Sequence, residues 1–329
     1  TGSDLYCKYD QGKLIEVESC HFTGTIDLET YVSNQHNFQF VYNVSDLIPV
    51  NQDVYVKPDG QDSNDGLSWD TAFRTIHHAL GVLNSSSGVV LTVHVAPGVY
   101  SPSNTGELFP LPLQSNLRVS GTGSMNEVII DAESSGNVFA AVEQVNTTLW
   151  NLTITGGSSE CGGGIYIENS EVTIDSCKIS NNQTVNTRMS SFPGGDVKGG
   201  GGVFVRYTQP MTTNVVIRKS IIEDNHSAFK GGGILVEGGS NVLIGGSVED
   251  SNYFSGNSAG AGLGAAIACG SYDADEIDAS NNSFEFNYNS TNMVSPQDQF
   301  ILDNCTYDCN LATGTNIYVS PDGSDENSG

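Results

Sequence analysis

The stretch Gly162-Gly163-Gly164-Ile165-Tyr166-Ile167 decides the fold, because a glycine block followed by a short β run returns three more times. The later copies are Gly200-Gly201-Gly202-Val203, Gly231-Gly232-Gly233-Ile234 and Gly264-Ala265-Ala266-Ile267. Their spacings of 38, 31 and 33 residues are typical of one solenoid coil with loop insertions. The repeat therefore predicts coils stacked on coils.

A second motif, an apolar residue three positions before an asparagine, alternates with the first. It occurs at Ile179 to Asn182, Ile222 to Asn225, Phe254 to Asn257 and Phe284 to Asn287. Short strands are unstable alone but pair with equivalent strands of neighbouring coils. Glycine allows tight corners, and stacked asparagine amides bond along a ladder. We therefore expect Asn182 and Asn225, although both lie in sequons, to be ladder residues and not glycan sites.

The chain before the repeats predicts a cap for the solenoid. Val54-Tyr55-Val56 reads as a strand, and an amphipathic helix is expected over roughly residues 70–83, N-capped by Ser68 or Asp70. Its apolar face would carry Ala72, Phe73, Ile76, Ala79 and Leu80. A helix there would cover strand edges that otherwise invite pairing.

These features resemble known families. The segment Val54 to Leu80, the turn Val95 to Tyr100 and the strand ending Ile129-Ile130-Asp131 resemble the pectin-lyase-like superfamily. The Gly-Gly-x-Ile and Phe-x-x-Asn repeats resemble those of polymorphic outer membrane proteins, although most blocks here read Gly-Gly-Gly where that family favours Gly-Gly-Ala. The resemblance covers about residues 53–310. It implies an all-β, right-handed parallel β-helix with one N-terminal capping helix and a bacterial surface role.

Three segments are expected along the chain. Residues 1–52 match nothing in the solenoid and, with the strand-like run 38–42, predict a small β appendage. Residues 53–315 form the β-helix. Residues 316–329 repeat the opening at Val54, so they are either the start of a second β-helix unit or a strand exchanged with another copy. The second alternative predicts head-to-tail assembly of copies, as a fibre or stalk.

Composition excludes some partners and favours a location. The 329 residues carry 38 acids against 12 bases, a net charge of −26, so nucleic acid is an unsuitable partner. No run of 18 apolar residues occurs, so no membrane insertion is expected. Frequent Asn-x-Ser/Thr sequons favour an extracellular or cell-surface location. Glycans are expected at Asn43, Asn84, Asn146, Asn151 and Asn289, with further sequons at Asn281 and Asn304.

The assignment of Asn151 depends on strand alternation. If Trp150, Leu152 and Ile154 point inward on one strand, Asn151 points outward.

Seven cysteines predict local disulfides. Short loops would be closed by Cys7–Cys20 and by Cys305–Cys309. Cys161 and Cys177 are expected to pair if their coils stack suitably, which leaves Cys269 over.

One loop has oxygen ligands suited to Ca²⁺. Asp59, Asp62, Asn64 and Asp65 lie together between glycines. The spacing departs from an EF-hand and lacks its distal Glu, so an Asx-rich turn is the alternative. No other cofactor is expected.

A polysaccharide lyase is the rival to a structural role. Arg218-Lys219 with Glu223-Asp224 is the only nearby basic and acidic set of the kind that pectate-lyase-like chemistry needs. Strand alternation would place Arg218 and Lys219 on opposite faces, so at most one could join a site. Because fold alone confers no activity, the sequence predicts an extracellular structural or adhesive protein that is not an enzyme. A polysaccharide-binding or lyase-like β-helix is the alternative.

Overall fold

The computed structural model describes residues 49–84, 88–185, 198–207, 214–237, 241–260, 264–269, 277–279, 281–289 and 300–301. The chain divides into two compact units, Thr1–Pro49 and Val50–Gly329. Nearly all described residues belong to the second unit. The predicted appendage strand at 38–42 and the segment 316–329 lie outside the described residues.

The second unit is a right-handed parallel β-helix, as the sequence predicts, and its described residues form four parallel sheets. Sheet 1 contains β1 (Val54–Val56), β2 (Leu91–Val95), β5 (Leu117–Gly121), β8 (Thr147–Trp150), β12 (Glu171–Asp175), β16 (Asn214–Arg218), β20 (Asn241–Ile244) and β24 (Ile277–Asp278). Sheet 2 contains β3 (Gly98–Tyr100), β6 (Val128–Asp131), β9 (Thr153–Thr155), β13 (Lys178–Ser180), β17 (Ile221–Glu223), β21 (Tyr253–Ser255) and β25 (Ser283–Glu285).

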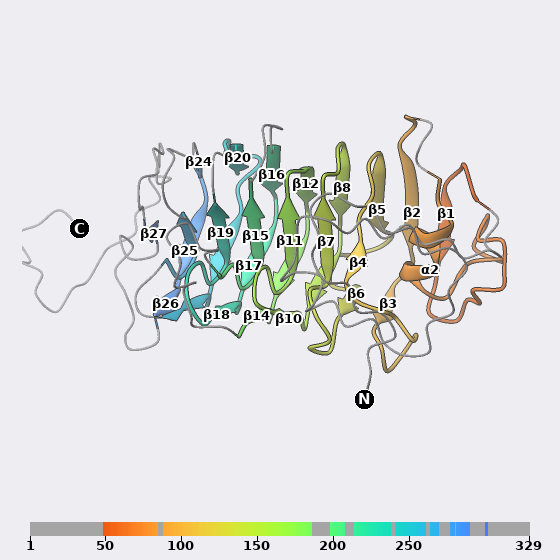
Figure 1. The fold of residues 1–329 in the computed structure, drawn as a ribbon, viewed down its shortest axis with the longest axis horizontal. Helices are drawn as coiled ribbons and strands as arrows, with labels where there is room; N and C mark the ends of the chain where they lie inside the picture. Colours follow the sequence, from red (N-terminus) through yellow and green to blue (C-terminus); the bar gives the residue numbers. More distant parts are fainter. Residues whose placement is uncertain are drawn as a thin grey trace, which may run out of the picture. The chain divides into compact units, whose positions relative to one another are not determined.

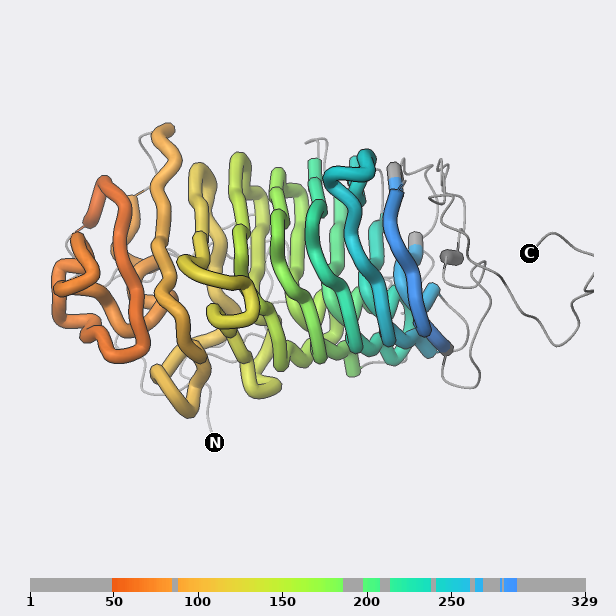
Figure 2. The backbone as a smooth tube through the Cα atoms, turned by 180° about the vertical axis from the view of Figure 1, so that it is seen from behind, coloured from red at the N-terminus to blue at the C-terminus, as the bar shows by residue number. Residues whose placement is uncertain are grey.

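The other two sheets complete the coils, and sheet 3 begins only at β10. Sheet 3 contains β10 (Ser158–Ser159), β14 (Gln183–Thr184), β18 (His226–Ser227), β22 (Ser258–Ala259) and β26 (Tyr288–Asn289). Sheet 4 contains β4 (Leu111–Pro112), β7 (Phe139–Val142), β11 (Ile165–Glu168), β15 (Val203–Arg206), β19 (Ile234–Glu237), β23 (Ile267–Cys269) and β27 (Phe300–Ile301). The chain visits the sheets in numerical order, and equivalent strands of successive coils lie side by side (Figures 1 and 2).

Inward side chains form apolar rows between the sheets. In sheet 2 the row passes from Ile154 through Ile179 and Ile222 to Phe254, one residue per coil. All four are 0 % exposed, and the Phe254 and Phe284 rings stack at 5.0 Å between centroids. Burial of apolar surface of this kind is the main favourable term in folding.

The asparagines three positions later form a second, polar row inside the corner between sheets 2 and 3. Asn182 Nδ2 donates to Asn225 Oδ1 at 3.0 Å, Asn225 Nδ2 to Asn257 Oδ1 at 3.0 Å and Asn257 Nδ2 to Asn287 Oδ1 at 2.8 Å. Each amide also donates to a carbonyl of the preceding coil, as Asn225 does to Ile179. The ladder role predicted for Asn182 and Asn225 is confirmed, because both are almost fully buried and bonded.

The glycine blocks form the corner between sheets 3 and 4. Gly162, Gly200, Gly231 and Gly264 all have φ between +60° and +70°, the left-handed region that a Cβ disfavours. The second glycine of a block faces a backbone instead: a Cβ on Gly201 would lie 2.4 Å from the Gly232 oxygen. The first three blocks therefore require glycine at both positions for two different reasons, whereas the fourth block has Ala265 at the second position.

The capping helix is shorter than predicted. α2 runs over Ile76–Val82, and Thr75 is its N-cap, not Ser68 or Asp70. Phe73 is buried but precedes the helix and forms a bridge with Val56. The helix packs against β1, β2 and β4 at the N-terminal end of the solenoid (Figure 1). No helix among the described residues has the length and apolarity that crossing a membrane requires.

The start of α2 is set by two distant carboxylates. Asp62 accepts from the backbone amides of Arg74 and Thr75 at 2.8 and 2.9 Å. Glu107 accepts from Ile76 and His77 at 3.0 and 2.6 Å. These amides would otherwise be unsatisfied at a helix N-terminus. The sequence-based expectation failed because Thr75 caps the helix by accepting from the His78 amide, and the carboxylates that satisfy the neighbouring amides lie outside the helical segment.

Candidate functional site

The outer face of sheet 1 presents a row of polar and aromatic side chains, which we call the outer row. In register from β1 to β16 it contains Tyr55, His94, Ser120, Trp150, Asp175 and Arg218. The strand residues on either side of these positions, such as Val54 and Val56, are buried in the core. Because strand residues alternate between faces, the outer row points away from the core, with a rise of about 4.8 Å per coil.

The N-terminal part of the row is an aromatic cluster. The Tyr55 ring stacks on the His94 imidazole with 5.0 Å between centroids and meets Trp69 edge-on at 4.8 Å. Trp69 is 38 % exposed. His94 Nε2 lies 3.4 Å from Asp53 Oδ2, and Oδ1 of the same carboxylate accepts from the Thr92 amide at 2.8 Å. The cluster thus places partly exposed ring faces beside fixed hydrogen-bonding groups.

The middle of the row contains Trp150, for which the predicted inward direction is wrong. Trp150 is the last residue of β8 and lies half-buried on the outer face, whereas Leu149 is the inward residue. Asn151 forms the corner after β8 with a φ of 59°. The inward and outward alternation of β8 therefore does not continue through Asn151 to Leu152 and Ile154, as the prediction assumed. The Arg118 guanidinium lies over the Trp150 ring, with Cζ 5.0 Å from the ring centroid.

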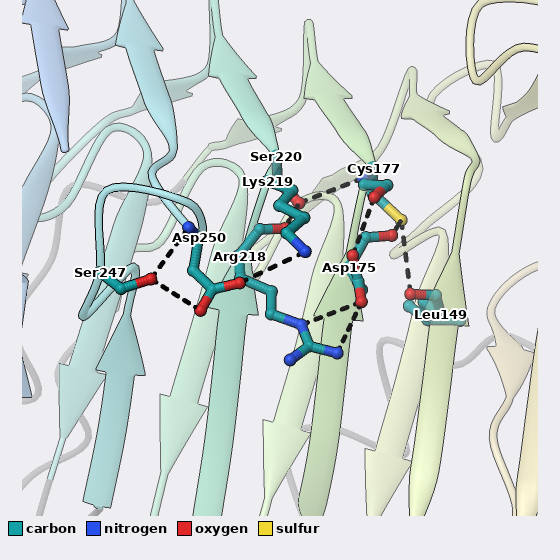
Figure 3. Close-up of polar contacts among 9 residues, drawn as sticks. Leu149, Asp175, Cys177, Arg218, Lys219, Ser220, Ser247 and Asp250 are labelled. Carbon is teal, nitrogen blue, oxygen red and sulfur yellow. Dashed lines mark hydrogen bonds and ion pairs between the residues drawn. The ribbon is translucent and has the colours of Figure 1, made fainter. Parts of the chain in front are cut away.

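The C-terminal part of the row is charged, and its charges are paired (Figure 3). Arg218 donates from Nε and Nη2 to Asp175 Oδ2 at 2.9 and 2.8 Å. Lys219 Nζ lies 3.5 Å from Asp250 Oδ1. The Ser247 hydroxyl, which donates to Asp250, lowers the pKa of that carboxyl.

The basic and acidic set that suggested lyase chemistry does not converge. Arg218 ends β16, but Lys219 turns the corner with a φ of 53°, so the two are not on opposite faces and both are partly exposed. Glu223 pairs with Lys178 at 2.6 Å. Asp224 lies at the next corner, beyond β17. The four residues therefore divide among different ion pairs and corners.

Cys177 lies at the corner between β12 and β13, beside Ser220 and Asp175 (Figure 3). Its Sγ donates to the carbonyls of Leu149 and Asp175 at 3.6 and 3.4 Å, and its amide donates to Ser220 Oγ at 3.1 Å. Burial raises the pKa of the Cys177 thiol to about 12. Since the thiolate is the reactive species, Cys177 is a packing residue.

The disulfide expected between Cys161 and Cys177 is wrong. Both side chains are buried, and they are not bonded to each other. Cys161 follows sheet 3 and Cys177 lies between sheets 1 and 2, so the coil places them at different corners. The other expected disulfide cysteines, Cys7, Cys20, Cys305 and Cys309, lie outside the described residues, and Cys269 ends β23.

The expected Ca²⁺ ligands do not form a cluster. Asp62 is occupied at the helix N-terminus, and Asp65 Oδ1 accepts from the Leu67 amide at 3.0 Å. Asn64 donates to the Ala72 carbonyl at 3.0 Å, and Asp59 lies 3.9 Å from Lys57. No group of three or more His, Cys, Asp or Glu suited to a metal occurs in the described part of the chain. The hydrogen bonds of Asp62, Asn64 and Asp65 fit the Asx-rich turn, which is the alternative that the sequence offers.

The sequons differ in accessibility. Asn146 is exposed and Asn84 and Asn281 are half-buried. Asn151 Nδ2 donates to the carbonyls of Gly121 and Gly123 at 3.0 and 2.7 Å, so a glycan there would break a bond that the corner uses. Asn289 lies in β26, while Asn43 and Asn304 are outside the described residues.

Arg118 and the outer row were not predicted from the sequence. Ser120 and Trp150 are each the fourth residue of their strands, β5 and β8. The register that pairs them depends on the lengths of the loops between the strands, which the sequence pattern does not give. Glu107 was not predicted either, because it has no local signal.

The chain is similar to a described family and to solved structures. No curated protein matches the sequence. The crystal structure of Escherichia coli YbhC is 11% identical, covers 72% of this chain and 73% of its own, and has a TM-score of 0.41. A rhamnogalacturonan lyase is 14% identical, covers 78% of this chain and 88% of its own, and has a TM-score of 0.29. At these scores neither likeness bears on activity. The family model described as "Protein of unknown function (DUF1565)" matches residues 58–302, and the chain belongs to that family.

Proposed function

We propose that this chain is an extracellular adhesive protein that binds an extended glycan along the outer row without cleaving it. The observation that carries the proposal is the alignment of Tyr55, His94 and Trp150 on one face, in register and partly exposed.

Sugar rings suit such a face for a physical reason. Their C–H faces are apolar and pack on aromatic rings, while their hydroxyls hydrogen-bond to polar groups at the rim. Trp69 offers a partly exposed ring beside Tyr55, and His94 and Asp53 offer hydrogen-bonding groups. A glycan lying along the solenoid axis could contact several coils, because the row repeats at each strand step.

The charge pairing supports binding over turnover. A lyase of this fold class needs a basic side chain able to remove a proton from the substrate. Arg218 is engaged through two nitrogens with Asp175, and Lys219 lies beside Asp250. Either base would have to lose its partner before it could act.

A glycan array probed with the full chain, with and without EDTA, tests the proposal. Binding should survive EDTA, and Trp69→Ala should weaken it about tenfold. Tyr288→Ala is the matched control, because Tyr288 is 43 % exposed, like Trp69 at 38 %, but lies in sheet 3. Release of new reducing or unsaturated ends from a bound glycan, abolished by Arg218→Gln or Asp224→Asn, would instead identify an enzyme.

A structural unit of a fibre or stalk is the second candidate. The observation that favours it is the return of the opening sequence of Val54 at Ile317, which would let a strand add to a neighbouring copy. Electron micrographs of the native protein distinguish the two: filaments with a repeat of one chain support the fibre, and isolated particles that bind glycan support the adhesin.

A further inference from the structure

The Arg118 guanidinium has no acidic side chain beside it among the described residues. Five described bases have an acid beside them: Lys57 has Asp59, Lys178 has Glu223, Lys198 has Glu160, Arg218 has Asp175 and Lys219 has Asp250. Arg74 instead donates to the backbone carbonyls of Asn104 and Thr105. Arg118 makes no ion pair with any residue in the described part of the chain, although the chain carries 38 acids against 12 bases. In so acidic a protein an unneutralised guanidinium requires an explanation.

The geometry holds the Arg118 side chain ready. It leaves the outer face of β5 between Thr92 and Thr148 of the adjoining strands. Its guanidinium lies over the Trp150 ring, and its Nε is buried without a hydrogen-bond partner among the described residues. Stacking on an aromatic ring fixes the plane of a guanidinium but leaves its edges free to donate.

We infer that Arg118, oriented by Trp150, forms a subsite for one oxyanion, a carboxylate or a sulfate ester, carried by a sugar of the bound glycan. The inference rests on the proposed function and specifies the chemistry of one position in it. A planar guanidinium offers parallel N–H donors that match the two oxygens of such a group, and these charge-assisted bonds are stronger than bonds to a neutral hydroxyl.

The surrounding charge restricts the ligand further. The other arginine on the outer face of sheet 1, Arg218, is already bound by Asp175. Among the described strand residues of this face, Arg118 is therefore the one arginine without an acidic partner. A net charge of −26 repels densely charged polyanions at distances up to about a Debye length. The geometry therefore favours a mostly neutral glycan with isolated acidic substituents over a polyanion.

Calorimetry with three oligosaccharides of one backbone tests the subsite: a neutral form, a form with a single carboxylate and a form with a single sulfate ester. Wild-type protein should bind at least one anionic form about tenfold more tightly than the neutral form. The anionic form with the larger gain in affinity over the neutral form shows whether the subsite prefers a carboxylate or a sulfate ester. Raised salt should reduce the gain, because the contact is electrostatic.

Variants separate this inference from the proposed function. Arg118→Gln should abolish the preference for the anionic forms over the neutral form, and Arg118→Lys should retain part of it. Lys57→Gln, which removes a cation outside the outer row, should change nothing. Neutral binding with no preference for either anion, or a preference that survives Arg118→Gln, overturns the subsite alone. Absence of binding to all three forms overturns the subsite together with the glycan-binding function.

Discussion

The carboxylate of Glu107 accepts a hydrogen bond of 2.6 Å from the backbone amide of His77, which lies 30 residues earlier in the chain. This contact ties the first turn of the capping helix to the loop that precedes β4. It also buries an acid, because Glu107 is 1 % exposed. The contact therefore makes the cap sensitive to pH.

Glu107→Gln should change how stability depends on pH. Burial raises the pKa of Glu107 from 4.5 to about 7, so the folded state binds this proton more tightly than the unfolded state does. The contribution of Glu107 is fully present below pH 4.5 and is lost as the pH rises through about 7. Gln does not titrate, so the wild type should lose stability relative to the variant over this window, by an amount on the order of 3 kcal/mol.

Denaturant unfolding of both proteins between pH 4 and 8 measures this difference. Burial lowers the pKa of His77 and of His78, which opposes the Glu107 trend, but both proteins share that effect and it cancels in the comparison. Curves that stay parallel throughout would contradict the assignment.

Asn225→Ala should destabilise the fold strongly. Asn225 is 0 % exposed, donates to the Ile179 carbonyl and to Asn257, and accepts from Asn182. Its removal leaves several buried groups unpaired, at about 1–3 kcal/mol each. The control is Asn181→Gly, at an exposed corner with a φ of 55°, which should change the free energy of unfolding little. Equal effects of the two changes would show that the ladder contributes nothing.

Gly201→Ala should prevent normal folding or cost more than about 3 kcal/mol, because the new Cβ would meet backbone oxygens of Gly232 and His226 at 2.4 and 2.5 Å. Gly88→Ala is the comparison. Gly88 has a φ of +73° and open space where the Cβ would lie, so it should cost only about 1 kcal/mol of backbone strain. Thermal unfolding of both variants measures the contrast, and a Gly201→Ala protein as stable as the wild type would refute the close packing of the corner.

Glycan mapping of protein from its native source should find Asn146 occupied and Asn182 and Asn225 unmodified. Asn146 is exposed, whereas the other two are 1 % and 0 % exposed and bonded within the ladder. An unmodified Asn146 would remove the support that the sequons give to a secreted protein. A glycan on Asn225 would be incompatible with the coil.

The parts of the fold that repeat could be predicted from the sequence. The spacing from Ile222 to Asn225 predicted both the inward row and the ladder, because the same corner recurs in successive coils and needs the same residue types each time. The features that could not be predicted occur once in the chain and depend on individual residues. Asn151 takes up a left-handed corner conformation, and this reversed the direction expected for Trp150. The cap begins at Thr75 because Asp62 and Glu107 reach it from elsewhere in the chain.

Intrinsic fluorescence during a glycan titration tests the central claim most directly. The chain contains two tryptophans, Trp69 beside Tyr55 and Trp150 beneath Arg118, and both lie at the proposed binding face. We expect a saturable change in emission whose midpoint matches the calorimetric affinity, and Trp150→Phe should remove part of that change. Tight binding by calorimetry with no change in tryptophan emission would place the glycan elsewhere on the protein and contradict the account.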